Sequence, residues 1–232
     1  MQIKPISLSL AGVLALSGAP VWADSPHEFS ANVSLTSNYK YRGITQTDDG
    51  PAVQGGFDYS YTPASLYAGV WASNVDAKAF ADANVEMDWY AGWNPSFGDL
   101  GLDLGYLYYS YPNSRNSDNN THEFHLGATY TLGMFTPGLT GYYSDDFFGT
   151  KEAWYWDASV DVALPQDFTV SAHYGWNKFH DSAADYQDWK IGVAKGFAGF
   201  DFDLSYVGTN DKPSGVGKAY DDVLVFTVGK SF

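Results

Sequence analysis

Residues 29–41 have the sequence Phe29-Ser-Ala-Asn-Val-Ser-Leu-Thr-Ser-Asn-Tyr-Lys-Tyr41, in which apolar and polar side chains alternate at almost every position. Successive side chains of a β-strand point to opposite faces, so this pattern predicts one strand with an apolar face and a polar face. A polar loop follows, and the alternation then resumes over residues 53–61. Together the two segments predict a long antiparallel hairpin.

The same alternation is repeated along the rest of the chain. We expect further strands at 66–72, 83–93, 100–108, 123–132, 139–143, 154–164, 168–176, 189–195, 200–206 and 220–232. This gives about twelve strands, most of them long enough for a tilted strand to cross a bilayer. The predicted connections are alternately short and long, as in barrels whose short turns face the periplasm. The sequence therefore predicts an all-β fold, a transmembrane antiparallel up-and-down β-barrel.

A secreted β-sandwich would also show alternating strands, but the distribution of aromatic residues favours a membrane. Rings on the apolar face gather near strand ends, whereas Ala, Val, Leu and Met occupy the middles. The expected girdle residues include Tyr39, Tyr41, Trp93, Tyr106, Trp154 and Tyr206. Amphipathic rings prefer the headgroup level, so two such girdles are typical of a bilayer-spanning barrel.

The two ends of the chain carry signals of export. Residues 1–23 combine a basic start, a short apolar run and a small-residue site ending at Ala23, which predicts a cleaved signal peptide. Residues 24–232 then form one barrel domain. The terminal ring of Phe232 lies on the apolar face of the last strand and is expected to engage the barrel assembly machinery. A net charge of -15 leaves no basic stripe for nucleic acid.

The polar face would line the lumen, and there acidic residues outnumber basic ones. The candidate pore-lining residues are Lys40, Arg42, Asp58, Glu86, Asp88, Asp103, Glu123, Asp157, Asp161 and Lys190. Burying an unpaired carboxylate is costly, so we expect many of these acids to meet water and to give a hydrated lumen that enriches cations. Lys40 and Arg42 are expected to face acids on the opposite wall and create a transverse field. In the alternative interpretation, the carboxylates only solvate a narrow, closed interior.

Catalytic and metal sites are poorly supported. Ser171 and His173 share a face, but it is the predicted lumenal face, away from lipid substrates, and the chain has no G-x-S-x-G motif. His122 points away from Glu123 and His125 on a strand, which argues against a metal site. We therefore expect no catalytic residue, no metal and no cofactor.

Several segments resemble the TorF-family porin-like proteins, also catalogued as the Gcw_chp proteins of proteobacteria. They are residues 37–47, 51–58, 86–92, 188–193 and 202–210. The resemblance implies an outer-membrane barrel that forms a pore, and it marks Tyr41, Arg42, Gly43 and Gln54 as motif members. It implies neither a particular substrate nor catalytic residues.

We therefore expect a channel in the outer membrane of a Gram-negative bacterium, through which small hydrophilic solutes diffuse passively. About twelve strands lie between the filled eight-stranded barrels and the wide porins, which favours a narrow, selective pore. The expected partners are outer-membrane lipid, lipopolysaccharide and the unidentified solute. A non-conducting structural or adhesive surface barrel is the main alternative, and a lipid-modifying barrel enzyme is a weaker one.

Overall fold

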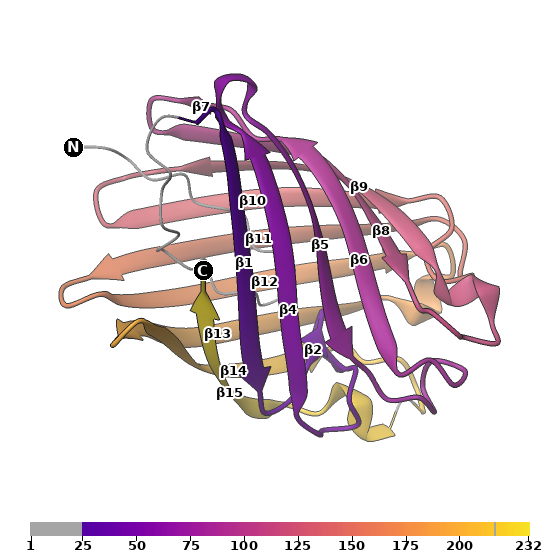
Figure 1. Cartoon of the computed structure of the whole chain (residues 1–232). Coiled ribbons are helices and arrows are strands. Elements are labelled where there is room, and N and C mark those ends of the chain that lie inside the picture. Colours follow the sequence, from indigo (N-terminus) through magenta and orange to yellow (C-terminus); the bar gives the residue numbers. More distant parts are fainter. Residues whose placement is uncertain (1–24, 216) are drawn as a thin grey trace.

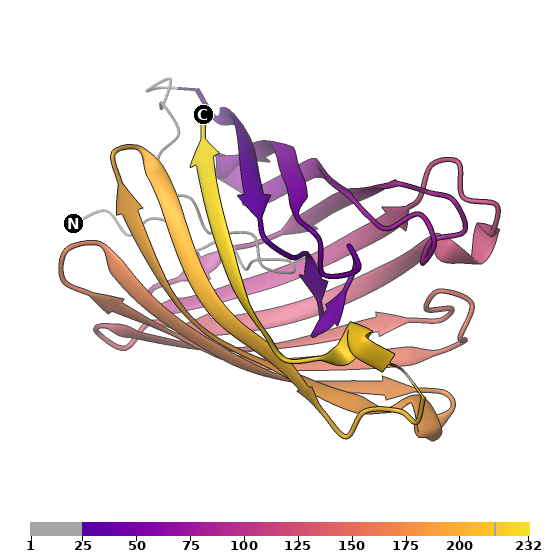
Figure 2. The ribbon, with the colours of Figure 1, turned by 90° about the horizontal axis from the view of Figure 1, so that it is seen from below.

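The computed structural model describes residues 25–215 and 217–232, so the signal peptide predicted for residues 1–23 lies outside the described part. Twelve long antiparallel strands close into a barrel (Figures 1 and 2). They are β1 (His27–Thr36), β4 (Ala52–Tyr61), β5 (Leu66–Asn74), β6 (Val85–Trp93), β8 (Leu100–Ser110), β9 (Thr121–Tyr130), β10 (Phe135–Ser144), β11 (Ala153–Leu164), β12 (Phe168–Phe179), β13 (Tyr186–Phe197), β14 (Phe200–Asn210) and β15 (Val223–Ser231). Pairing of β1 with β15, from Asn32↔Ser231 to Thr36↔Thr227, closes the ring.

The connections alternate in length as the sequence predicted. The short turns follow β4, β6, β9, β11 and β13, and the turn after β6 contains a two-residue strand, β7 (Ser96–Phe97), that pairs with β8. The turn between β13 and β14 has positive φ at both Ala198 (53°) and Gly199 (78°), the type I′ geometry whose twist matches that of the flanking strands. In residues 25–215 and 217–232, no helix is long and apolar enough to cross a membrane.

The outer surface of the barrel carries its large apolar side chains. Leu126 and Phe57 are 61% and 52% exposed, and the rings of Trp93, Tyr106 and Trp154 also point outward. The interior of the barrel is polar: Asp103, Thr140 and Ser205 are all buried there. A sandwich core would have the opposite arrangement, so the predicted transmembrane barrel is confirmed.

The expectation of a first strand that runs through Tyr41 is wrong. β1 ends at Thr36, and the chain turns into the barrel, where β2 (Lys40–Tyr41) and β3 (Ile44–Thr45) pair with each other. We call residues 37–51 the inner hairpin. In Figure 2 its two short arrows lie between the indigo wall and the orange wall of the barrel. Tyr39, expected in the outer aromatic girdle, is instead 3% exposed inside the barrel.

Candidate functional site in the barrel lumen

The inner hairpin is built around a two-residue turn. Arg42 and Gly43 have φ of 45° and 80°, so both occupy the left-handed region that a type I′ turn requires. Asn38 stabilises the base of the hairpin: its side-chain oxygen accepts a hydrogen bond from Thr45 Oγ1 (2.7 Å), and its amide nitrogen donates to Asp49 Oδ1 (2.8 Å). These local bonds hold residues 37–51 as a compact unit.

One side of the inner hairpin packs on the wall formed by β5, β6, β8 and β9. The ring of Tyr39 meets Trp71 of β5 edge-on at 5.4 Å, and the hydroxyl of Tyr41 lies 2.9 Å from that of Tyr109 on β8. Leu107 of β8 belongs to the same cluster and is fully buried. The hairpin is therefore docked on an aromatic and aliphatic patch of the inner wall.

At the tip of the hairpin, Arg42 forms a buried ion pair. Its Nη2 donates to both Oε1 (2.8 Å) and Oε2 (2.9 Å) of Glu123 on β9, and Glu123 also accepts from Tyr109. The Arg42 guanidinium lies 4.0 Å from the ring centroid of Tyr155 on β11, at cation–π distance. We predicted that Arg42 would face acids on the opposite wall and create a transverse field across the lumen. Instead, Arg42 touches Glu123 directly and the two charges neutralise each other.

The other side of the hairpin reaches the far wall. A Cβ atom on Gly43 would lie 2.3 Å from Thr209 Cγ2 of β14, so only glycine fits at this contact. Lys40 Nζ donates to the carbonyl oxygens of Ala219 (3.2 Å) and Asp221 (2.9 Å) in the β14–β15 loop. Burial of Lys40 lowers the pKa of its amine. The inner hairpin thus spans the lumen from the β5–β9 wall to the β13–β15 wall.

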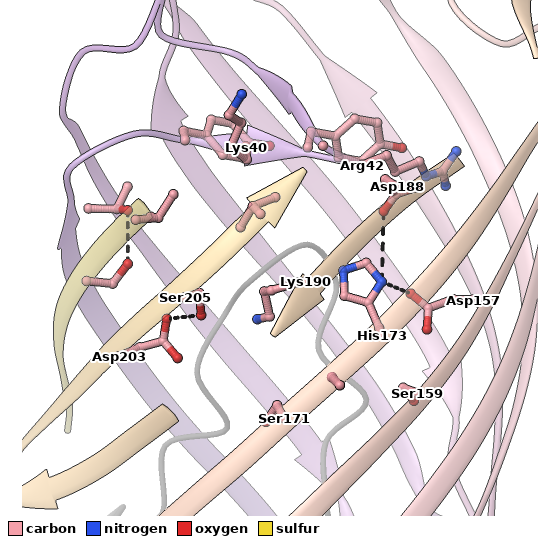
Figure 3. A pocket seen from close by; sticks show the side chains of 18 of the residues that line it. Lys40, Arg42, Asp157, Ser159, Ser171, His173, Asp188, Lys190, Asp203 and Ser205 are labelled. Carbon is pink, nitrogen blue, oxygen red and sulfur yellow. Dashed lines mark hydrogen bonds and ion pairs between the residues drawn. The ribbon is translucent and has the colours of Figure 1, made fainter. Parts of the chain in front are cut away.

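A polar cavity of about 230 Å³ lies beside the inner hairpin (Figure 3). Many of its lining residues carry hydroxyl groups: Thr36, Thr129, Thr136, Thr140, Ser159, Ser171, Ser205 and Thr227. Its ionisable lining includes Asp157, Asp161, Asp203 and Lys190 together with Lys40 and Arg42. Such a lining can hydrogen-bond to water and to small polar solutes without selecting one chemical group.

A cluster of charged and polar side chains occupies the wall of the cavity near the hairpin tip. His173 Nδ1 lies 3.1 Å from Asp157 Oδ2 and 3.8 Å from Asp188 Oδ1, as Figure 3 shows. The Tyr155 hydroxyl donates toward both carboxylates at 3.2 Å, and Asn177 donates to Asp188 at 2.8 Å. These bonds fix Tyr155 beneath Arg42.

The predicted site residues fall into two groups. The cavity is lined by five of them: Lys40, Arg42, Asp157, Asp161 and Lys190. In the part of the chain that the structure describes, the other five do not line it: Asp58, Glu86, Asp88, Asp103 and Glu123. The expectation that the acids must meet water is wrong for Glu86, Asp88, Asp103 and Glu123, which are 2%, 4%, 7% and 2% exposed.

Tyrosine hydroxyls donate hydrogen bonds to several of the predicted acids. Tyr111 donates to Glu86 (2.7 Å), Tyr67 to Asp103 (2.9 Å) and Tyr90 to Asp58. Hydrogen bonds to a charged acceptor offset part of the cost of burying it. Sequence reasoning missed these bonds, although the alternation already placed Tyr90 on the polar face.

The candidate catalytic and metal groups are not assembled into a site. Ser171 and His173 line the lumenal cavity, away from the lipid-facing surface. His122 points outward, where its Nε2 lies 2.8 Å from Asp145 Oδ1, while Glu123 and His125 are buried inside. Across residues 25–215 and 217–232, no cluster of three or more His, Cys, Asp or Glu side chains could hold a metal ion.

The fold and the polar lumen define a twelve-stranded transmembrane β-barrel. The chain belongs to the Gcw_chp family, described as a bacterial protein of unknown function, which matches residues 21–232. Two solved structures show the same fold at 9% sequence identity. The KdgM porin matches with a TM-score of 0.60 over 88% of this chain and 98% of its own, and the NanC porin with 0.56 over 87% and 98%. No curated protein matches the sequence.

Proposed function

We propose that this protein is an outer-membrane channel of a Gram-negative bacterium, through which small hydrophilic solutes diffuse passively. The observation that carries the proposal is a polar cavity enclosed by a barrel whose outer surface is apolar. An apolar exterior suits lipid, and a hydroxyl-rich interior suits water-soluble solutes. The names of the two similar structures, both porins, agree with this function, as does the TorF-type resemblance of residues 37–47.

We further propose that the channel prefers cations. Arg42 is neutralised by Glu123, so its charge contributes little to the field in the cavity. The acidic residues of the lining are Asp157, Asp161, Asp188 and Asp203, and the basic ones besides Arg42 are Lys40, Lys190 and His173. His173 Nδ1 lies 3.1 Å from Asp157 Oδ2, and the structure pairs no basic side chain with Asp161 or Asp203 in residues 25–215 and 217–232. An excess of carboxylates in a narrow lumen raises the local concentration of cations.

The test is the reversal potential of the refolded protein in a planar bilayer separating two salt concentrations. Steady single-channel steps with a reversal potential of the cation-selective sign would support both parts of the proposal. Steps with the opposite sign would keep the channel and overturn the cation preference. Complete silence from protein that migrates as a folded, heat-modifiable barrel would overturn the channel.

One observation favours a second candidate, a non-conducting structural barrel whose acidic loops contact lipopolysaccharide or a partner. The inner hairpin spans the lumen and is docked on both walls. Swelling of proteoliposomes in small sugars separates the two candidates, because a permanently closed barrel gives no swelling with any solute.

A further inference from the structure

We propose that the inner hairpin is a gate. When docked it closes the lumen on the side of the long loops, Arg42 keeps it docked by compensating the buried charge of Glu123, and solutes cross after it is released. This inference rests on the proposed channel function, and it assigns to one segment of the chain the control of permeation.

The first argument is the reach of the hairpin. Tyr39 of the hairpin contacts Trp71 of β5, and Arg42 pairs with Glu123 of β9. Gly43 of the hairpin packs against Thr209 of β14. These strands lie on different sides of the closed sheet, whose order runs β6-β5-β4-β1-β15-β14-β13-β12-β11-β10-β9-β8. A segment that contacts three separated parts of the barrel wall obstructs the passage between them.

The second argument is that the hairpin is separate from the barrel sheet. In the described part of the chain, β2 and β3 form their own two-stranded sheet and join no barrel strand. The hairpin is fixed by side chains and by a few backbone bonds of its base, such as Asp76 N to Gln46 O at 2.8 Å. Its tip can therefore leave the wall while every strand-to-strand bond of the barrel stays intact.

The third argument is the ion pair itself. The Arg42 and Glu123 side chains are 8% and 2% exposed, and Arg42 Nη2 donates to both carboxylate oxygens. Removing one member of a buried ion pair leaves an uncompensated charge, whereas replacing both by neutral groups removes that penalty. Replacing Arg42 alone should therefore weaken docking, because it leaves Glu123 buried without its partner.

The fourth argument is that the wall beneath the hairpin is incompletely satisfied. Within residues 25–215 and 217–232, Glu86 Oε2 and Asp88 Oδ1 are buried without a hydrogen-bond partner. Both residues lie on β6, on the wall that the hairpin covers. Buried unsatisfied carboxylate oxygens raise the free energy of the docked state, so water reaching them would favour release.

The experiment measures release and permeation separately. The chain has no cysteine, so Leu107→Cys introduces a single thiol under the docked hairpin, and its rate of maleimide labelling in lipid vesicles reports release. Ala52→Cys, at another buried position of the same cluster, is the second probe if Leu107→Cys fails to assemble. Conductance is recorded for the same preparations.

Four backgrounds are compared: the wild-type hairpin, Arg42→Gln, the double variant Arg42→Gln with Glu123→Gln, and Lys195→Gln. The last removes the same charge from a lysine that contacts Phe168 and Gln166 away from the hairpin. We expect Arg42→Gln to raise the labelling rate at least tenfold and to increase the open probability. The double variant should return the labelling rate most of the way to wild type, and Lys195→Gln should leave it unchanged.

The outcomes distinguish the gate from the channel. Full conductance from Leu107→Cys protein with the wild-type hairpin, while its thiol stays protected, would overturn the gate and keep the channel. Accelerated labelling of Arg42→Gln with no conductance from any variant would overturn the channel and leave a hairpin that moves without gating a pore. Unchanged labelling in Arg42→Gln would show that Arg42 does not hold the hairpin and would overturn the inference.

Discussion

Replacing Gly43 by alanine tests whether the inner hairpin presses against β14. Gly43 has φ of 80°, and a Cβ atom there would meet Thr209 Cγ2 at 2.3 Å, Asp188 Cβ at 3.0 Å and the carbonyl oxygen of Gly208 at 3.1 Å. Two penalties are therefore expected, one from the backbone conformation and one from the collision. Gly199 offers a matched control, because it has φ of 78° and nothing within 4 Å of its ideal Cβ.

The two penalties can be estimated separately. A left-handed conformation costs an L-residue about 1–2 kcal/mol, which is the whole effect expected for Gly199→Ala. Forcing an extra methyl group into a packed contact costs about 1–3 kcal/mol more. Gly43→Ala should therefore reduce stability by about 2–5 kcal/mol, unless the hairpin undocks first and limits the loss to its docking free energy.

The assay is equilibrium unfolding of the barrel refolded in detergent micelles, followed by the fluorescence of the seven tryptophans in residues 24–232. Thr209→Ser removes the colliding methyl group and retains the hydroxyl that donates to the Tyr220 carbonyl at 2.7 Å. In the Gly43→Ala background it should therefore recover most of the steric part of the loss, because the contact with Thr209 Cγ2 is the shortest of the three. If Gly43→Ala costs no more than Gly199→Ala and leaves the Leu107→Cys thiol protected, the close packing of the hairpin on β14 is refuted.

Two further predictions concern selectivity and assembly. Replacing both Asp161 and Asp203 by Asn should lower the cation preference, because two carboxylates are removed from the cavity lining, and Lys190→Gln should raise the cation preference. Reversal potentials measure both effects. Shifts of the same sign in the two variants would contradict the electrostatic argument. Phe232→Ala should reduce the amount of folded barrel in the outer membrane of cells but should leave the yield of refolding in detergent unchanged. The reason is that the terminal ring is 54% exposed, so it would act as a recognition signal for assembly rather than as part of the core. Equal amounts of the variant and the wild type in cells would exclude that role.

Most of the barrel was predictable because its strands obey one rule. In β6, Glu86, Asp88 and Tyr90 lie on the inner face of the barrel, and Met87 and Trp89 lie on the outer face. The same alternation determines on which face every other residue of the strand lies. The exposed rings and the polar interior follow from it. Strand ends were predicted less well: β10 begins at Phe135 rather than near Leu139, because Gly138 and Pro137 interrupt the pattern that marks a strand.

The inner hairpin was missed because its sequence continues the alternation of β1. Tyr39 and Tyr41 follow Leu35 at the spacing of an outward-facing strand, and periodicity cannot distinguish a strand that continues from one that turns back. The available signals were local: Gly43 at the turn, and Asn38 with Thr45, Thr47 and Asp49 able to bond to one another. The burial of Glu123 could not be predicted from its neighbours in sequence, because its partner Arg42 comes from the hairpin.

The distribution of carboxylates connects selectivity with the gate. Glu86, Asp88 and Glu123 lie on the wall that the docked hairpin covers, whereas Asp157, Asp161 and Asp203 lie on the cavity. In the docked state the first three contribute little to the field that a solute meets, because they are buried and Glu123 is paired with Arg42. Release of the hairpin would expose all three carboxylates to the lumen and move the Arg42 charge away from them. A released lumen would therefore be more negative than the docked one, so opening and cation preference should increase together.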